Sequence, residues 1–218
     1  MHFFDRNQVS TPACLINPPD GRTYSNLRGA ETEEIRLKLL ALQVQRCAYC
    51  ERRTGHERAH GHIEHFRDQS RHHHLTLDWS NMFWSCNDER TCGKHKDKCC
   101  KEEGPQRRFE PDDLINPAID DPETYLLFVA DGTVAPRTGL DDEARLRAIE
   151  TIRVFNLDES AYLTRCREDA LKPYIRRVDE MIELGPERFR QFIESEVQIA
   201  SEEPFGTAIK HFLTRQAV

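Results

Sequence analysis

Long apolar segments are missing from this sequence, and their absence argues against a protein with membrane-spanning helices. Only 38% of the 218 residues are hydrophobic and 32% are charged, and no run approaches the roughly 20 apolar residues that cross a bilayer. The first residues also lack the basic stretch followed by an apolar stretch that marks a secretory signal. We therefore expect a soluble, cytoplasmic protein with no membrane partner and a highly charged surface.

Motifs for nucleotide hydrolysis and for repeat folds are also missing. No glycine-rich loop ending in Lys-Ser or Lys-Thr occurs, which excludes a nucleotide triphosphatase of the P-loop type. The chain has no internal repeat, and its only low-complexity feature is a run of three histidines at 72–74. Any ATP-driven step must therefore come from a separate chain.

Cysteine and histidine, by contrast, are concentrated in one part of the chain. Six of the eight cysteines lie between Cys47 and Cys100, and eight of the ten histidines lie between His56 and His95. In a reducing cytoplasm such clustering favours a metal site over disulfide bonds.

The cysteine spacing predicts a structural zinc site. Cys47 and Cys50 are two residues apart, so one tight turn directs both thiolates to the same point. Cys86 and Cys92 supply a second pair with a wider spacing, and four thiolates complete a closed tetrahedral site. The alternatives to Cys92 as the fourth ligand are the two cysteines that follow it, Cys99 and Cys100.

Charge is divided unevenly between the two halves of the chain. Residues 1–101 carry 16 Lys/Arg against 13 Asp/Glu, a net +3, whereas residues 102–218 carry 15 against 25, a net −10. Because phosphate attracts cations, we expect any nucleic acid to lie over the first half. Natural phosphate contacts there are Arg52, Arg53, Arg67, Arg71, Lys94, Lys96, Lys98 and Lys101. The acidic half suits a partner surface, or it merely aids solubility.

The apolar pattern predicts an α+β fold in four regions. Residues 1–46 form an arm and a helix, 47–101 the cysteine-rich core, 102–140 a β-hairpin connection, and 141–218 a helical region. The helix in the first region is predicted at 30–45 from its amphipathic pattern.

Turn residues mark the later elements. An apolar run at 125–130, Asp-Gly at 131–132 and a second short run at 133–135 predict the hairpin, since Asp-Gly supplies the positive φ angles of a tight turn. Gly185 can end one helix and Pro186 can start the next. Ser201 predicts the start of another helix.

Within the core, the order of polar residues resembles the HNH (ββα-metal) endonuclease motif. An acidic residue directly precedes a histidine, an asparagine follows about fifteen residues later, and a cysteine-flanked segment ends in lysine. The residues that carry the resemblance are Glu64, His65, Asn81, Cys86 and the segment 92–96. This resemblance implies a small ββα unit that is held together by zinc. So small a unit buries little apolar surface by itself, and a bound zinc ion would stabilise it.

The resemblance is closer to one group of HNH enzymes, the PtuB nuclease subunits of Septu-type anti-phage defence systems. It covers residues 40–167 and rests on five segments: 43–51, 63–67, 79–81, 114–117 and 151–157. It implies a nuclease effector controlled by a separate ATPase subunit, and the acidic helical region is a plausible surface for docking that subunit.

The HNH resemblance assigns a role to each polar residue of the motif. His65 would be the general base, since imidazole titrates near neutral pH. Glu64 would bind a catalytic Mg²⁺ or Mn²⁺, and Asn81 would hydrogen-bond the hairpin backbone and hold His65 in place. Adjacent side chains of a strand point to opposite faces, so both Glu64 and His65 reach one site only if the strand is twisted or bulged.

One position departs from the HNH pattern. The residue after the last cysteine, which commonly supplies the second metal ligand, is Gly93 here and has no side chain. We expect His95 to replace it, although a regular helix would direct His95 away from that point. Asn87 or Asp88 are the alternatives.

Together these features predict a metal-dependent endonuclease that hydrolyses phosphodiester bonds in DNA, with RNA not excluded as substrate. The alternative is a zinc-containing nucleic-acid-binding module without catalysis. The pair of Glu64 beside His65 favours the endonuclease over the binding module, because a binding module has no use for a general base next to a carboxylate. A third possibility is an adaptor whose zinc only supports a protein interface.

Overall fold

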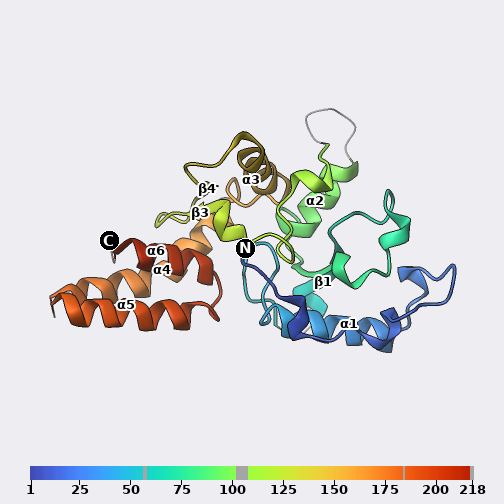
Figure 1. The fold of residues 1–218 in the computed structure, drawn as a ribbon, viewed down its shortest axis with the longest axis horizontal. Helices are drawn as coiled ribbons and strands as arrows, with labels where there is room; N and C mark the ends of the chain where they lie inside the picture. Colours follow the sequence, from blue (N-terminus) through green and yellow to red (C-terminus); the bar gives the residue numbers. More distant parts are fainter. Residues whose placement is uncertain (56–57, 102–107, 184, 217–218) are drawn as a thin grey trace.

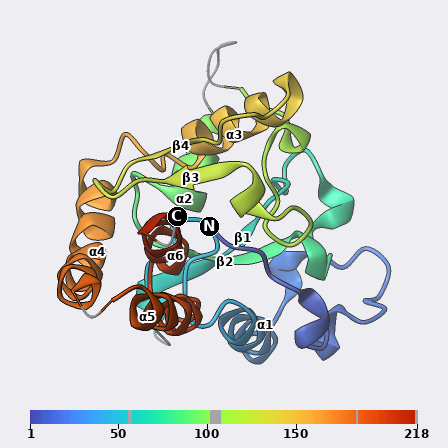
Figure 2. The ribbon, with the colours of Figure 1, turned by 60° about the vertical axis from the view of Figure 1, so that its left-hand side comes forward.

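Six α-helices and four short strands form the regular structure of the residues that the computed structural model describes, which are 1–55, 58–101, 108–183 and 185–216. The helices are α1 (Gly29–Leu42), α2 (Cys92–Lys101), α3 (Asp142–Val154), α4 (Ala161–Ile182), α5 (Pro186–Ala200) and α6 (Gly206–Gln216). The strands are β1 (Gly61–His65), β2 (Met82–Cys86), β3 (Leu126–Phe128) and β4 (Val134–Pro136). The predicted α+β class is confirmed (Figures 1 and 2).

Short 3-10 helices connect these elements. They are Arg6–Gln8, Ala13–Leu15, Tyr24–Asn26, Arg58–His60, His73–Leu75, Trp79–Asn81, Pro111–Asp113 and Pro122–Thr124. None of the described helices combines the length and the apolar character that crossing a bilayer requires.

The β1–β2 pair lies at the centre of the first half of the chain. The strands are antiparallel, and their register runs without a bulge from Gly61 opposite Cys86 to His65 opposite Met82. Every residue of β2 is buried, because the strand contacts both α1 and α2. Its apolar start, Met-Phe-Trp at 82–84, therefore fits a strand covered on both faces.

Helix α1 ends slightly earlier than the predicted range 30–45. Val44 and Gln45 have φ angles of +49° and +55°, which L-residues adopt rarely and which no α-helix continues through. The left-handed pair turns the chain from α1 directly into the first two cysteines.

The predicted hairpin is β3–β4, paired from Leu126 opposite Pro136 to Phe128 opposite Val134. Its turn is one residue longer than a two-residue Asp-Gly turn, since Val129 N donates to Thr133 O. Only Gly132 within it has a positive φ, +83°, as in a three-residue hairpin loop.

Two apolar clusters divide the helices. The main core surrounds β1 and β2 and includes Ala148, Val154 and Phe155 from α3 and the residue after it. The second cluster joins α4, α5 and α6 through Leu171, Tyr174, Val178, Ile193, Ala200, Ile209 and Leu213. Figure 1 shows these three helices side by side, to the left of the β1–β2 region. We call α4, α5 and α6 the C-terminal bundle.

The predicted helical region 141–218 is thus divided between two clusters, because α3 packs in the main core and α4, α5 and α6 form the second cluster. The first residues of the predicted 102–140 region, 102–107, lie outside the described residues.

Candidate functional site

Four buried cysteines come together where β1, β2 and α2 meet. The Sγ atoms of Cys47, Cys50, Cys86 and Cys92 all lie within 4.8 Å of one another. Cys47 and Cys50 lie in a turn before β1, Cys86 ends β2, and Cys92 begins α2. Backbone bonds attach the turn to the sheet, because Ala48 N donates to Trp84 O. Among the alternatives that the sequence left open, the structure brings Cys92 to the other three.

This cluster has the dimensions of a tetrahedral thiolate site. Zn–S bonds of about 2.3 Å at tetrahedral angles separate sulfurs by about 3.8 Å, and Cys50 Sγ lies 4.0 Å from Cys86 Sγ. Burial raises the pKa of the Cys92 thiol, so a charged thiolate there requires a compensating cation. Cys92 also has a φ of +56°, an uncommon angle that persists only where the surroundings impose it. The four cysteines can therefore hold one zinc ion.

Glu64 is almost completely buried and held by two neighbours. Its side chain is 1% exposed, its Oε2 accepts a hydrogen bond from the Tyr49 hydroxyl, and its Oε1 lies 2.5 Å from Lys96 Nζ. Burial would lower the pKa of Lys96, but the charges of Glu64 and Asp97 and the bond to Glu64 together outweigh that effect and raise it. Burial raises the pKa of Tyr49 and the charge of Glu64 adds to this rise, so the phenol stays a donor. The sequence placed Lys96 among surface phosphate contacts, and that prediction is wrong, since Lys96 is fully buried.

His65 is held in one tautomer by the loop between β1 and β2. Its Nε2 lies 3.0 Å from Thr76 O, and a carbonyl only accepts, so Nε2 carries the proton. Nδ1 accepts from Gln69 Nε2 at 3.2 Å, and Gln69 Oε1 in turn accepts from the Thr76 hydroxyl. Burial lowers the pKa of His65. The ring is therefore neutral, with its basic lone pair on Nδ1.

Asn81 fixes the loop that contains these partners. Its Nδ2 donates to the carbonyls of Arg67 and Leu75 at 3.0 and 3.2 Å, and its Oδ1 accepts from Arg67 N at 2.7 Å. The amide thus joins the loop after β1 to the start of β2. Its effect on His65 is indirect, because it positions the backbone on either side of Gln69.

Glu64 and His65 make contacts on different sides of β1. Glu64 meets Tyr49 and Lys96, whereas His65 packs edge-on against Tyr24 at 4.9 Å between ring centroids. The sequence required a twist or bulge to bring both to one site, and the register here has no bulge. The two residues share only their position at the C-terminal end of β1.

His95 does not lie with Glu64. Its Nδ1 lies 2.9 Å from Val154 O at the end of α3, and Cys99 Sγ lies 3.7 Å from the same nitrogen. Position 93, by contrast, faces Glu64 directly, since a Cβ on Gly93 would lie 2.5 Å from Glu64 Cγ. Of the two alternatives to His95, Asn87 bonds His62 Nδ1 through its Oδ1, and Asp88 pairs with Arg52 and Arg90.

Several of the expected phosphate contacts are paired with acids. Arg67 pairs with Asp112, Arg71 with Asp68, and both Lys94 and Lys98 with Glu89. A phosphate would have to displace these partners. The pairs with Asp112 and Glu89 are exposed and of low individual energy, whereas the Asp68 side chain is only 10% exposed.

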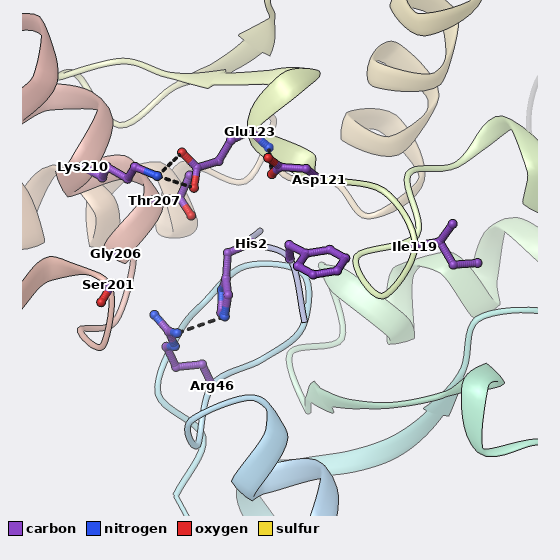
Figure 3. A pocket seen from close by; sticks show the side chains of 10 residues that line it. His2, Arg46, Ile119, Asp121, Glu123, Ser201, Gly206, Thr207 and Lys210 are labelled. Carbon is purple, nitrogen blue, oxygen red and sulfur yellow. Dashed lines mark hydrogen bonds and ion pairs between the residues drawn. The ribbon is translucent and has the colours of Figure 1, made fainter. Parts of the chain in front are cut away.

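A cavity of about 360 Å³ lies away from this site, between the N-terminal residues and α6 (Figure 3). His2, Arg46, Glu123 and Lys210 line it, and Figure 3 shows them engaged in pairs, Arg46 with His2 and Lys210 with Glu123. The Arg46 guanidinium donates to the His2 imidazole and Lys210 is paired with Glu123, so these four side chains are engaged with one another.

Comparison with known proteins identifies a relative of part of the chain. No protein-family model matches the chain. The sequence is 28% identical over 121 residues to a Bacillus thuringiensis protein named Septu protein PtuB, and the match covers 54% of this chain and 43% of that protein. The match thus spans less than half of that relative. This similarity supports a Septu-related family.

Proposed function

We propose that the protein is a metal-dependent HNH endonuclease that hydrolyses phosphodiester bonds in DNA as the nuclease effector of an anti-phage defence complex. The observation that carries the proposal is His65, a buried neutral histidine with a fixed tautomer, directly beside a buried carboxylate. Both lie on the first strand of a β1–β2–α2 unit that is tied together by four cysteines, which is the element order of a ββα-metal core.

His65 is the proposed general base. With Nε2–H bonded to the Thr76 carbonyl, Nδ1 accepts a proton from water, and the resulting imidazolium still donates to Thr76. Gln69 occupies Nδ1 in this structure, so the attacking water takes the place of its amide when substrate binds. Asn81 keeps the loop that contains Gln69 and Thr76 in register.

Glu64 is the proposed ligand for the catalytic Mg²⁺ or Mn²⁺. A bound divalent cation stabilises the charge that develops on the phosphate and the leaving oxygen. Because Glu64 and His65 make contacts on different sides of β1, the proposal requires a phosphodiester that lies across the C-terminal end of the strand and meets one side chain on each side. The Lys96 ammonium pairs with this carboxylate in the absence of a bound cation.

The similarity to Septu protein PtuB motivates a separate ATPase subunit as partner. The C-terminal bundle has exposed acids on α4 and α5, namely Asp179, Glu180, Glu187 and Glu194. We propose that this surface docks the ATPase. Removing the bundle is a poor test, because Arg167 of α4 donates to the carbonyls of Gly132 and Leu157 in the main core. Charge reversal of the four acids tests the surface instead, and unchanged ATPase capture by that variant would refute the docking proposal.

The nuclease proposal is tested by cleavage of plasmid DNA with Mg²⁺ or Mn²⁺, with and without the ATPase. Wild type should cleave, a chelator should stop cleavage, and His65→Ala should lose about 10²–10⁴-fold in rate. His74→Ala, an exposed histidine in the same loop, is the matched control, and zinc content should be equal in all three proteins. RNA of the same length tests the alternative substrate.

A zinc-containing nucleic-acid-binding module remains the second candidate. It is favoured by the ion pair of Glu64 with Lys96, which a purely structural carboxylate would also make. DNA binding without cleavage under every metal and partner condition would support this function over the nuclease.

A further inference from the structure

The space above Gly93, between β1 and the first turn of α2, brings together side chains that suit a divalent cation. A Cβ at position 93 would lie 2.5 Å from Glu64 Cγ, 3.0 Å from Ser85 Oγ and 3.1 Å from His62 Nε2. His62 and Glu64 are two residues apart on a regular strand, so both project from the same face of β1. The absent side chain of Gly93 thus leaves a space that an imidazole and a carboxylate border.

The tautomer of His62 is fixed by Asn87. The Asn87 Nδ2 donates to the carbonyls of Ala59 and Gly61 at 3.0 and 3.3 Å, which orients Oδ1 as the acceptor. This Oδ1 lies 3.0 Å from His62 Nδ1, so Nδ1 carries the proton and Nε2 keeps its lone pair. A metal-binding histidine usually donates its second ring N–H to an outer hydrogen-bond partner, and Asn87 is such a partner for His62.

The lone pair of His62 has no protein partner among the described residues. His62 Nε2 is shielded from solvent and makes no hydrogen bond. Glu64 Oε1 is paired with the Lys96 ammonium, whose Nζ lies 2.5 Å away and also donates to the carbonyls of His65 and Phe66. A shielded, unbonded acceptor such as His62 Nε2 is costly unless something binds it, and the Glu64 carboxylate borders the same space.

Further negative charge lies close by. Asp97 is one turn beyond Gly93 on α2, and its pKa is raised, first by burial and also by the charge of Glu64. Its carboxylate is half exposed, so it adds negative potential at the solvent side of the space.

We propose that His62 and Glu64 bind one divalent cation together, with His62 in place of the ligand that Gly93 cannot supply. The inference rests on the proposed nuclease function, for which this cation is the catalytic one, and it replaces His95 as second ligand. An imidazole in the ligand set favours Mn²⁺ over Mg²⁺, which prefers oxygen ligands alone.

The test is Mn²⁺ binding to zinc-loaded protein without DNA, measured by the electron paramagnetic resonance of free Mn²⁺ and by calorimetry. Wild type should bind one Mn²⁺ per chain, more tightly than Mg²⁺. His62→Ala should weaken Mn²⁺ binding at least tenfold, and Asn87→Ala, which only releases the tautomer, should weaken it by about tenfold. His74→Ala and His95→Ala are the matched controls and should bind like wild type. Zinc content and circular dichroism verify that each variant is folded.

Wild-type affinity in His62→Ala, or no Mn²⁺ binding by wild type, would overturn the inference. Cleavage by wild type and His65→Ala, measured in parallel, separates this failure from failure of the proposed function. Metal-dependent cleavage with His62 dispensable for Mn²⁺ refutes only the His62 site. Mn²⁺ binding through His62 without any cleavage refutes only the nuclease.

Discussion

The cysteine-stapled unit of β1, β2 and α2 and the C-terminal bundle are stabilised by different means. The first buries thiols and charges, with Glu64, Lys96 and the four cysteines all nearly inaccessible to solvent. The bundle's own cluster buries aliphatic side chains and one tyrosine, and Arg177, which pairs with Glu196, has a side chain that is 42% exposed. The one buried arginine of α4, Arg167, points toward the main core, where it donates to the carbonyls of Gly132 and Leu157. Burying charge is costly unless every group is paired, so the first region depends on specific partners, whereas the second depends on packed area.

The same difference distinguishes residues suited to catalysis or metal binding from residues that only support the fold. Polar groups that are buried and specifically paired, such as His65 and Glu64, are the ones whose protonation and ligation a protein controls. The bundle offers ordinary amphipathic helices, which suit a docking surface. The two regions meet at Glu51, which is next to Cys50 and accepts from Thr207 N of α6 at 3.0 Å.

The largest expected effect follows loss of the cysteine site. Cys86→Ser should reduce zinc from one per chain to nearly none and unfold the stapled unit, because structural zinc contributes on the order of 10 kcal/mol to such units. Metal analysis and chemical denaturation measure both effects. Cys14→Ser, a half-buried thiol outside the cluster, should change neither. Full zinc content in Cys86→Ser would refute a four-cysteine site.

Breaking one ion pair in each region compares their buried charge directly. Lys96→Met should cost about 3–5 kcal/mol in the free energy of unfolding, because it leaves Glu64 and two carbonyls buried without their cation. Arg177→Met should cost about 1 kcal/mol or less, since the Arg177 side chain is 42% exposed. Equal losses in the two variants would contradict the contrast between the regions.

A smaller effect than the loss of Lys96, and one that depends on pH, concerns the junction between the main core and α6. Burial would raise the pKa of Glu123, but hydrogen bonds from His211 and Lys210 outweigh it and hold the pKa at about 2. Because this is below the unfolded value of 4.5, the stabilisation is present above pH 4.5 and is lost as pH falls toward 2.

Glu123→Gln should therefore remove about 2 kcal/mol of stability at pH 6 and much less at pH 3, after allowance for partial exposure of the pair. Denaturation of both proteins across this range measures the difference and cancels acid effects on zinc that they share. A constant difference between pH 6 and pH 3 would show that Glu123 is not held by charge.

Sequence patterns predicted correctly those elements that are determined by residues close together in the chain. The cysteines converge because CxxC and the two later cysteines flank one hairpin, and α5 begins at Pro186 after Gly185, whose φ is +91°. The hairpin at 126–136 followed its turn residues, although the loop is one residue longer than a two-residue turn.

The predictions that were wrong depended on contacts distant in sequence. Helix α6 begins at Gly206 and not at Ser201, because Ser201 follows directly after α5 and Phe205 has a φ of +59°. His95 bonds Val154, and no spacing near position 95 indicates that α3 lies there. The burial of Lys96 and the position of His62 against Gly93 depend on how α2 packs on β1, which sequence patterns do not specify.

The most direct test measures both DNA cleavage and Mn²⁺ affinity in two variants, His65→Ala and Glu64→Gln. We predict that His65→Ala reduces single-turnover DNA cleavage by about 10²–10⁴-fold and leaves Mn²⁺ affinity unchanged, whereas Glu64→Gln loses both cleavage and Mn²⁺ binding. Wild-type cleavage in His65→Ala, with the same zinc content, would contradict the account, because the site would then have no base at His65.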